Sequence, residues 1–365
     1  MTRRKDPDKP SAGTARRRKP TSYDVARLAG VSQSAVSRAF SNNGYVSEAA
    51  REKIRAAAAQ LGFRPNALAR GLITQRSRLV GVVVADLYYS FYVSILHQLN
   101  GALRASDFQA LLFSIPSGDD IDSMIADVLA YQVDGVIMNS ARLSSRAPSI
   151  CRDAGIPVVT MNRIVDDPGI SAVATDNRGA GRMVGRFLQS GGHHRFGFIS
   201  GLDDTSTSRD RQAGFSETLA RAPKIASGGF IYDGGYDAAL ELLRGADAPD
   251  AIFCASDIMA MGAMDALRFE LGLTPGRDIS VVGFNNAAEA AWRTYDLTSV
   301  TASAEELSQR AVEILASLIE DPTTEAQREL LPGQLVLRGS ARIPQDWAPE
   351  DDFSALAPIR HPKDS

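Results

Sequence analysis

Apolar runs and helical patterns alternate along the chain from residue 79 onward, and this alternation limits the fold more than any other feature. The run 79–84, LVGVVV, is apolar throughout, as expected for a strand of a parallel sheet with both faces covered. Similar runs lie at residues 110–115, 135–139, 158–161, 172–175, 196–200, 251–255 and 280–284. Helical patterns separate them at residues 92–106, 121–131, 178–190, 209–220, 236–244, 258–271 and 304–319. The alternation predicts parallel α/β sheets.

Two doubly wound lobes suit this segment better than one, because the pattern continues for about 265 residues. The segments VGVVV at 80–84 and FGFI at 196–199 echo each other. In open α/β sheets, ligands bind beyond the carboxyl ends of the strands. Two facing lobes would therefore place a small molecule in the cleft between them.

A helix-turn-helix is predicted ahead of this segment. Val25 and Leu28 fall at helical spacing, Gly30 interrupts the run, and Ser32 can cap a second helix over 33–40. Two short helices joined by a tight turn form this motif. The second helix is expected to turn outward Gln33, Ser34, Ser37 and Arg38. Small polar side chains and one arginine are suited to a DNA major groove.

A third helix and a short fourth one are predicted after the motif. Ser47 is expected to cap the third helix, which ends at Gly62. Its apolar face consists of Ile54, Ala57, Ala58 and Leu61. Pro65 then begins a helix of about two turns, a length that is marginal in water. We expect it to be ordered only when a partner copy and DNA pack on it, since Gly71 lowers its stability by up to about 1 kcal/mol.

The charge is divided unevenly between the two parts of the chain. Residues 1–78 hold 17 Lys and Arg against five Asp and Glu, a net charge of +12. The remainder holds 23 basic and 38 acidic residues, a net charge of −15. This division predicts a polyanionic partner for the first part alone. Residues 1–20 are expected to be a disordered basic arm, either attracted to phosphates or a solubilising tail.

The compartment is expected to be a reducing cytoplasm. The N-terminus lacks the apolar core of a signal peptide, and no run approaches 18 apolar residues, so no membrane partner is expected. Cys151 and Cys254 imply no disulfide framework, and Cys254 is expected to be a buried small hydrophobe. Residues 344–365 are Pro- and Asp-rich and are expected to form a disordered tail.

The signals of an enzyme are weak or absent. The glycines of GAGRMVG at 179–185 do not match the dinucleotide-binding fingerprint and fall within a helical pattern. The chain contains no G-x-S-x-G nucleophile elbow. His193 and His194 fall in a glycine-flanked turn and are expected to lie on the surface rather than to bind a metal. We therefore expect no catalytic residues, no metal and no cofactor.

Short motifs along the whole ordered chain resemble those of one family. They include YDVA at 23–26, AGVS at 29–32, VSR at 36–38, VS at 46–47 and PNALARGL at 65–72. Further motifs are VDG at 133–135, IPVV at 156–159, QAGF at 212–215, SDIMAMG at 256–262 and VGF at 282–284. Each is weak alone, but the ordered series, over about residues 21–342, resembles the lactose-repressor/purine-repressor (LacI/GalR) family of bacterial transcription regulators.

The resemblance implies a fold and an assembly. The fold would be a helix-turn-helix headgroup, a hinge helix, and a two-lobed, doubly wound parallel-sheet core of the periplasmic-binding-protein type. The expected divisions are an arm 1–20, a DNA-binding domain 21–64, a hinge 65–78, a core 79–343 and a tail 344–365. Within the core, the N-lobe would comprise 79–162 and 293–320, and the C-lobe 163–291 and 325–343. A homodimer would bind a near-palindromic DNA operator. A tetramer is not indicated, because the sequence shows no C-terminal helix with a heptad pattern.

The resemblance also implies which residues contact DNA. Gln33, Ser34 and Arg38 match positions that read base edges, and their side chains suit adenine and guanine. Leu72 matches a leucine wedged between base pairs from the minor groove, although an ordinary core leucine is the alternative. The residues assigned to DNA binding are Thr21, Tyr23, Gln33, Ser34, Ser37, Arg38, Asn66, Ala69, Arg70 and Leu72.

Effector-binding positions carry over in the same way. They are Phe91, Tyr92, Asn162, Arg211, Phe230, Asp257 and Asn285. Phe91 and Tyr92 could instead pack between the lobes, and Asp257 could instead cap the following helix. Asn162 and Asn285 stand where relatives often carry Asp, so we expect a less cationic or more anionic ligand than usual. A sugar or sugar derivative is the expected class, and Thr205 argues against a purine.

The function expected from these residues is a ligand-responsive transcriptional repressor. One alternative is a solute-binding protein with no role on DNA, against which the +12 headgroup argues. The other is an enzyme on the α/β core, for which no catalytic constellation is present in the sequence.

Overall fold

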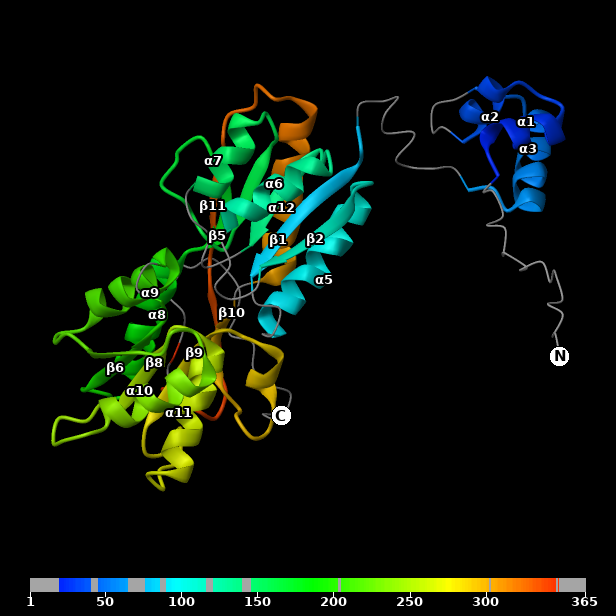
Figure 1. Ribbon diagram of the computed structural model, residues 1–365. Coiled ribbons are helices and arrows are strands. Elements are labelled where there is room, and N and C mark those ends of the chain that lie inside the picture. Colours follow the sequence, from blue (N-terminus) through cyan, green and yellow to red (C-terminus); the bar gives the residue numbers. More distant parts are fainter. Residues whose placement is uncertain are drawn as a thin grey trace, which may run out of the picture. The chain divides into compact units, whose positions relative to one another are not determined.

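The computed structural model describes residues 20–40, 45–64, 76–85, 90–115, 121–139, 146–202, 205–301, 303–345 and 347. The chain forms two compact units that divide between Ser77 and Arg78 (Figure 1). Residues 1–19 of the predicted basic arm and the hinge positions Asn66, Ala69, Arg70 and Leu72 lie outside the described residues.

The first unit contains the three helices that were predicted, α1 (Ser22–Ala29), α2 (Gln33–Ala39) and α3 (Glu48–Leu61). Thr21 and Asp24 form a reciprocal capping box at the start of α1, and Gly30 ends it at φ 67°. Ser32 caps α2 as predicted, since its Oγ accepts from Ala35 N at 3.2 Å. Ser47 occupies the N-cap position of α3 as predicted, but its side chain makes no capping hydrogen bond.

A small core holds these helices together. Each helix contributes one residue that is at most 1% exposed, namely Val25, Val36 and Ile54. The predicted inward face of α3 is largely confirmed, because Ile54, Ala57 and Ala58 all belong to this core. Leu28 lies at the predicted spacing but is 47% exposed, so α1 buries a narrower stripe than its sequence indicates.

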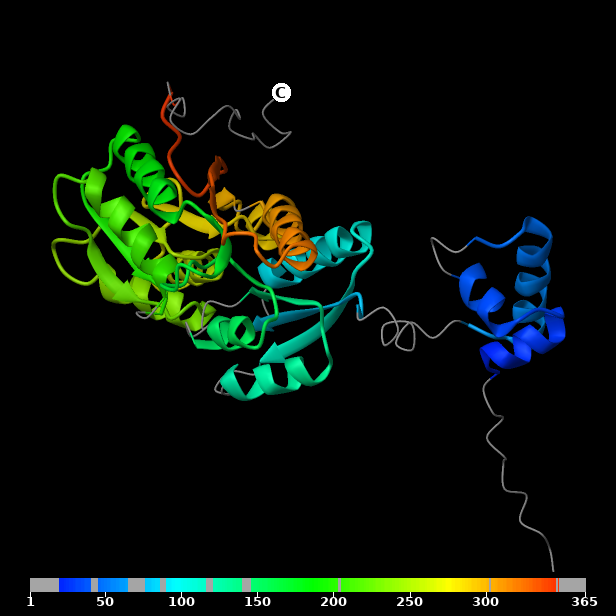
Figure 2. The ribbon, with the colours of Figure 1, turned by 90° about the horizontal axis from the view of Figure 1, so that it is seen from above.

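The first lobe of the second unit is a six-stranded parallel sheet of order β11-β5-β4-β3-β1-β2. Its strands are β1 (Leu79–Ala85), β2 (Gln109–Ile115), β3 (Gly135–Asn139), β4 (Val158–Met161), β5 (Ser171–Thr175) and β11 (Arg328–Leu331). Helices α5 (Ser90–Ala105) and α12 (Ala304–Glu320) pack side by side on one face (Figure 2). Helices α6 (Ile121–Ala130) and α7 (Arg146–Asp153) cover the other.

The second lobe repeats this plan with a sheet of order β12-β10-β9-β8-β6-β7, in which β12 alone is antiparallel. Its strands are β6 (Phe196–Ser200), β7 (Lys224–Ser227), β8 (Ala251–Cys254), β9 (Ser280–Asn285), β10 (Thr298–Thr301) and β12 (Gln334–Val336). Its helices are α8 (Asn177–Ser190), α9 (Ser206–Thr218), α10 (Tyr232–Leu242), α11 (Asp257–Phe269) and the 3-10 helix η1 (Ala288–Ala291). Cys254 is fully buried among these elements, as predicted.

The fold class is confirmed, but the predicted lobe boundaries are wrong at three strands. Strand β5 was assigned to the C-lobe with 163–291, yet it pairs with β4 in the first sheet. Strand β10 was assigned to the N-lobe with 293–320, yet it pairs with β9 in the second. Strand β11 was assigned to the C-lobe with 325–343, yet it pairs with β5.

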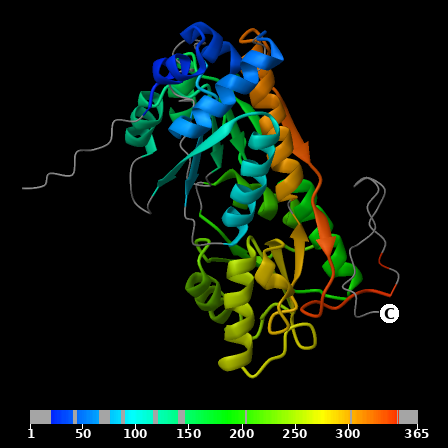
Figure 3. The same ribbon diagram turned by 90° about the vertical axis from the view of Figure 1, so that its right-hand side faces the viewer.

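The physical reason for this error is that the chain crosses between the lobes later than expected at each passage. The crossings follow β5, β10 and β11, and Figure 3 shows the last of them, where β11 leads into β12. Four- and five-residue strands carry no sequence signal for the sheet that they join, since both sheets bury similar apolar runs.

Candidate DNA-binding and effector sites

The predicted base-reading residues lie on the solvent-facing side of α2. Ser34, Ser37 and Arg38 are exposed, while Val36 and Ala39 on the opposite side are buried. Gln33 is half-buried, and its Nε2 donates to Ser22 Oγ at 3.3 Å. The helix therefore presents two hydroxyls and a guanidinium to a partner, with an amide held at its N-terminal end.

The predicted phosphate-contacting residues differ in how free their side chains are. Tyr23 is 68% exposed on α1. The Thr21 hydroxyl donates to Asp24 Oδ2 at 2.7 Å and accepts from Asp24 N at 3.4 Å. The Thr21 hydroxyl is therefore engaged in capping α1.

A hydrogen bond joins the two lobes close to the predicted effector residues. Ser90 Oγ, at the start of α5 in the first lobe, donates to Glu289 Oε2 of η1 in the second. Helix α5 follows β1, and η1 follows β9, so the carboxyl ends of these two strands lie near each other. We call this region the lobe junction. Phe91 and Tyr92 lie beside Ser90, with ring centroids 5.6 Å apart.

Arg211 is the buried cation of the lobe junction. It lies on α9 and is 6% exposed. Its Nε donates to Asn177 Oδ1 at 2.8 Å, its Nη1 donates to the Ala255 carbonyl at 2.5 Å, and its Cζ lies 3.4 Å from the centroid of Phe284. Burial lowers the pKa of Arg211 to about 9, and Tyr92 opposes that change from the other lobe. Tyr92 of the first lobe therefore lies within electrostatic range of Arg211 in the second.

Asp257 does not cap α11, so that alternative is wrong. Its Oδ1 accepts from Ser299 Oγ at 2.5 Å and its Oδ2 accepts from Ala287 N at 2.6 Å. It is 1% exposed, and burial raises the pKa of its carboxyl to about 7. With both oxygens engaged, Asp257 ties β10 and the segment before η1 to the start of α11.

Two asparagines form a polar pair at the carboxyl edge of the first sheet. Asn162 follows β4 at φ 60°, and its Nδ2 donates to Asn139 Oδ1 at 2.8 Å. Asn139 is fully buried, and its Nδ2 has no hydrogen-bond acceptor within the described part of the chain. Asn139 was not predicted, although a polar residue at the end of an apolar strand is a usable signal.

Phe230 follows β7 and Asn285 ends β9, at the carboxyl edge of the second sheet. Both have left-handed backbones, at φ 61° and 106°. The ring of Phe230 packs against Gly201, where a Cβ would lie 2.1 Å from it. Within the described residues, no hydrogen bond or ring contact joins Phe230 or Asn285 to another predicted effector residue.

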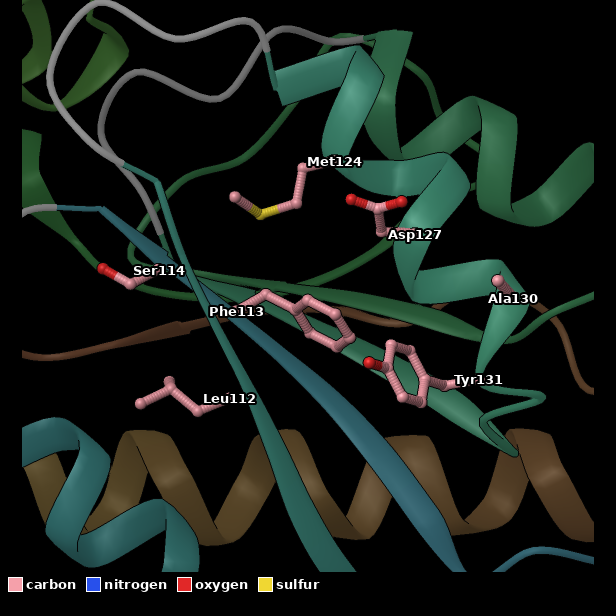
Figure 4. A pocket seen from close by; sticks show the side chains of 7 residues that line it. All are labelled: Leu112, Phe113, Ser114, Met124, Asp127, Ala130 and Tyr131. Carbon is pink, nitrogen blue, oxygen red and sulfur yellow. The ribbon is translucent and has the colours of Figure 1, made fainter. Parts of the chain in front are cut away.

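A cavity of about 600 Å³ lies elsewhere, on the first lobe between β2 and α6 (Figure 4). It is lined by Leu112, Phe113, Ser114, Met124, Asp127, Ala130 and Tyr131. None of the predicted effector residues lines it, and β2 is an edge strand, so it is a hollow at the edge of the sheet.

The prediction that His193 lies on the surface is wrong. Its side chain is 3% exposed, its Nδ1 lies 3.5 Å from Asp250 Oδ1, and burial lowers its pKa. His194 is exposed, as predicted. Among the residues that the structure describes, no group of three His, Cys, Asp or Glu side chains is placed to hold a metal ion. No described helix is both long and apolar enough to cross a membrane.

Comparisons with known proteins agree with both units. Residues 21–66 match the family model "Bacterial regulatory proteins, lacI family", and residues 184–341 match "Periplasmic binding protein-like domain". The HTH-type transcriptional regulator CelR of Thermobifida fusca is 33% identical, over 89% of this chain and 99% of its own. The ribose operon repressor of Escherichia coli (strain K12) is 29% identical, over 88% and 99%.

Solved structures give the same result. The lac repressor dimer bound to operator and the anti-inducer ONPF superposes with a TM-score of 0.80 at 27% identity, covering 88% of this chain and 99% of that one. The complex of the regulator CelR with cellobiose has a TM-score of 0.66 at 30% identity, covering 88% and 100%. This chain belongs to the LacI family of bacterial regulatory proteins, which are DNA-binding transcription regulators and not enzymes.

Proposed function

We propose that the protein is a transcriptional repressor that binds a near-palindromic operator as a homodimer, with its affinity controlled by a sugar-like effector. The observation that carries the proposal is the exposed face of α2, with Ser34, Ser37 and Arg38 on a helix whose N-terminus is capped by Ser32. The net charge of +12 on residues 1–78 supplies the attraction to phosphates.

In this proposal, α2 enters the major groove of each half-site. Arg38 donates to guanine O6 and N7, Gln33 pairs with adenine, and the hydroxyls of Ser34 and Ser37 accept or donate as the base requires. Thr21 and Tyr23 orient the headgroup against phosphates. The hinge residues Asn66, Ala69 and Arg70 lie along the minor groove, and Leu72 unstacks a central base step.

The lobe junction is proposed as the sensor. Phe91, Tyr92, Asn162, Arg211, Phe230 and Asn285 surround the effector, and Asp257 holds the segment before η1 in place rather than contacting the ligand. An effector that binds one arrangement of the lobes more tightly shifts the population toward it. Through the dimer, that shift changes the affinity for the operator by the same coupling free energy.

The test is specific binding to an operator from the regulator's own promoter region. Arg38→Ala removes a bidentate base contact and should lower specific affinity by about 10-fold or more. Arg55→Ala, which removes another exposed arginine, from α3, is the matched control for lost charge. Equal losses in the two variants would contradict base reading by α2, and a salt-independent affinity would contradict DNA binding altogether.

A further inference from the structure

A side-chain hydrogen bond joins the first residue of α1 to the first residue of α2. Ser22 follows the N-cap residue Thr21, and Gln33 follows the N-cap residue Ser32, so both stand in the first turn of their helices. Gln33 Nε2 donates to Ser22 Oγ at 3.3 Å, and both residues are half-buried. The turn of the helix-turn-helix thus brings the two helix N-termini together.

The Ser22 hydroxyl has no part in capping α1. The capping box consists of the hydroxyl and the backbone nitrogen of Thr21 with the carboxylate and the backbone nitrogen of Asp24. Within the described residues, no hydrogen bond other than the one from Gln33 involves Ser22 Oγ. The hydroxyl therefore serves Gln33 and not the start of its own helix.

This hydrogen bond decides which polar groups Gln33 presents to a partner. A glutamine amide carries two donors and an acceptor oxygen, and Ser22 takes one of the donors. One Nε2 hydrogen and Oε1 remain, and these are the donor and the acceptor that adenine N7 and N6 require. The amide is also held in place before DNA binds, so less side-chain freedom is lost on binding.

Arg38, towards the other end of α2, is held differently. Its side chain is exposed, and it makes no hydrogen bond or ion pair within the part of the chain that the structure describes. The same helix therefore presents an oriented amide at one end and an unrestrained guanidinium at the other. A change at Ser22 should affect the first and leave the second as it is.

We propose that Ser22 is a positioning residue for base reading, whose hydroxyl holds the Gln33 amide so that this side chain selects adenine. The inference rests on the proposed function, because it concerns the same face of α2, and it gives a role to a residue outside the DNA contacts proposed above. Since Ser22 acts through Gln33, its removal changes the choice of base at one position of each half-site and not the attraction to phosphates.

The test measures binding of the full-length protein to the operator from its own promoter region and to copies with each base pair of the half-sites replaced in turn. Gln33→Ala and Arg38→Ala identify the positions that these two residues read, because the base preference is lost there. Ser22→Ala should lower the preference for adenine at the Gln33 position by about 3- to 10-fold, since a neutral hydrogen bond is lost. The preference at the Arg38 position should not change.

Further variants separate positioning from a general effect on the fold. Ser22→Thr keeps the hydroxyl and should restore the preference, while Gln60→Ala removes an exposed polar side chain from α3 and should change no preference. A preference is a ratio of two affinities of one sample, so partial unfolding of a variant does not alter it. In the double variant, Ser22→Ala should add nothing to the loss that Gln33→Ala causes, because the two residues act as a unit.

Two results would overturn the proposal. An equal loss of affinity of Ser22→Ala for every operator copy would show that Ser22 contacts the DNA backbone. Additive losses in the double variant would show that Ser22 acts without Gln33.

The same measurements separate this inference from the proposed function. If the protein binds its operator specifically and no preference for adenine depends on Gln33, the inference fails and the function stands. If the wild type binds all DNA sequences equally, the proposed function fails.

Discussion

The two lobes share one plan but hold their helices in different ways. In the first lobe, α5 and α12 meet through large side chains, with Ile95, Leu99 and Leu103 on α5 all fully buried. In the second lobe, α8 and α9 meet backbone to backbone, because Gly181 and Gly214 lie at their crossing. A Cβ on Gly181 would lie 2.3 Å from the Arg211 carbonyl oxygen, and one on Gly214 would lie 1.9 Å from that of Arg178.

The difference has a consequence for the candidate effector site. Arg211 stands at the point where α9 touches α8 through its own carbonyl, so the second lobe holds its buried cation on a helix pair with little freedom to shift. Helices that meet through side chains can repack more readily. The second-lobe side of the lobe junction is therefore the more rigid one, and it holds the buried cation Arg211.

The largest expected effect comes from removing a large side chain in the first lobe. Leu99→Ala deletes a fully buried leucine between α5 and the sheet, and it should lower the free energy of unfolding by about 2 to 5 kcal/mol. Chemical denaturation measures it. Leu112→Ala, at a residue that is 43% exposed on β2, is the control and should cost far less. Equal costs would mean that α5 does not depend on its buried side chains.

Adding a methyl group where α8 and α9 cross should lower the stability of the second lobe. Gly214→Ala forces a methyl group against the Arg178 carbonyl, and since backbone cannot move aside cheaply, we expect a loss of about 3 kcal/mol. Denaturant unfolding gives the value. The matched variant is Gly101→Ala in α5, where a Cβ meets nothing within 4 Å, and it should be neutral or stabilising. If Gly214→Ala were tolerated as well as Gly101→Ala, the contrast between the lobes would fail.

The smallest effect concerns the buried carboxyl on the second-lobe side of the lobe junction. Burial raises the pKa of Asp257 from 3.8 to about 7, so the folded protein holds this proton more tightly than the unfolded chain. The stability that the group contributes is present below about pH 4 and is lost as the pH rises through about 7. If half of the shift is realised, the loss is about 2 kcal/mol.

Asp257→Asn removes this titration and supplies the comparison. Unfolding curves at pH 5 and pH 8 should show that the wild type loses stability relative to the variant as the pH rises. A difference between the two proteins that does not change with pH would show that Asp257 stays ionised in the fold.

Local sequence rules account for much of the structure. The predicted strands are confirmed to within one residue at each end, because continuous apolar runs bounded by turns are unambiguous when they are buried on both faces. The cap at Ser32 was predicted, because it depends on a residue only three positions away. The capping box of Thr21 and Asp24 follows the same local rule but was not predicted. The glycines at 179–185, which do not match the dinucleotide-binding fingerprint, serve helix packing instead. Gly181 and Gly185 allow α8 to approach α9 closely.

What only the tertiary structure decided depends on partners far apart along the chain. The oxygens of Asp257 are bound by groups 30 and 42 residues away, and Asn162 reaches Asn139 across 23 residues. The local sequence pattern also did not predict which sheet β5, β10 and β11 join, or that His193 is buried. A local sequence establishes which segments are strands, helices and caps, whereas the desolvation and pairing of polar groups depend on which distant segments the fold brings beside them.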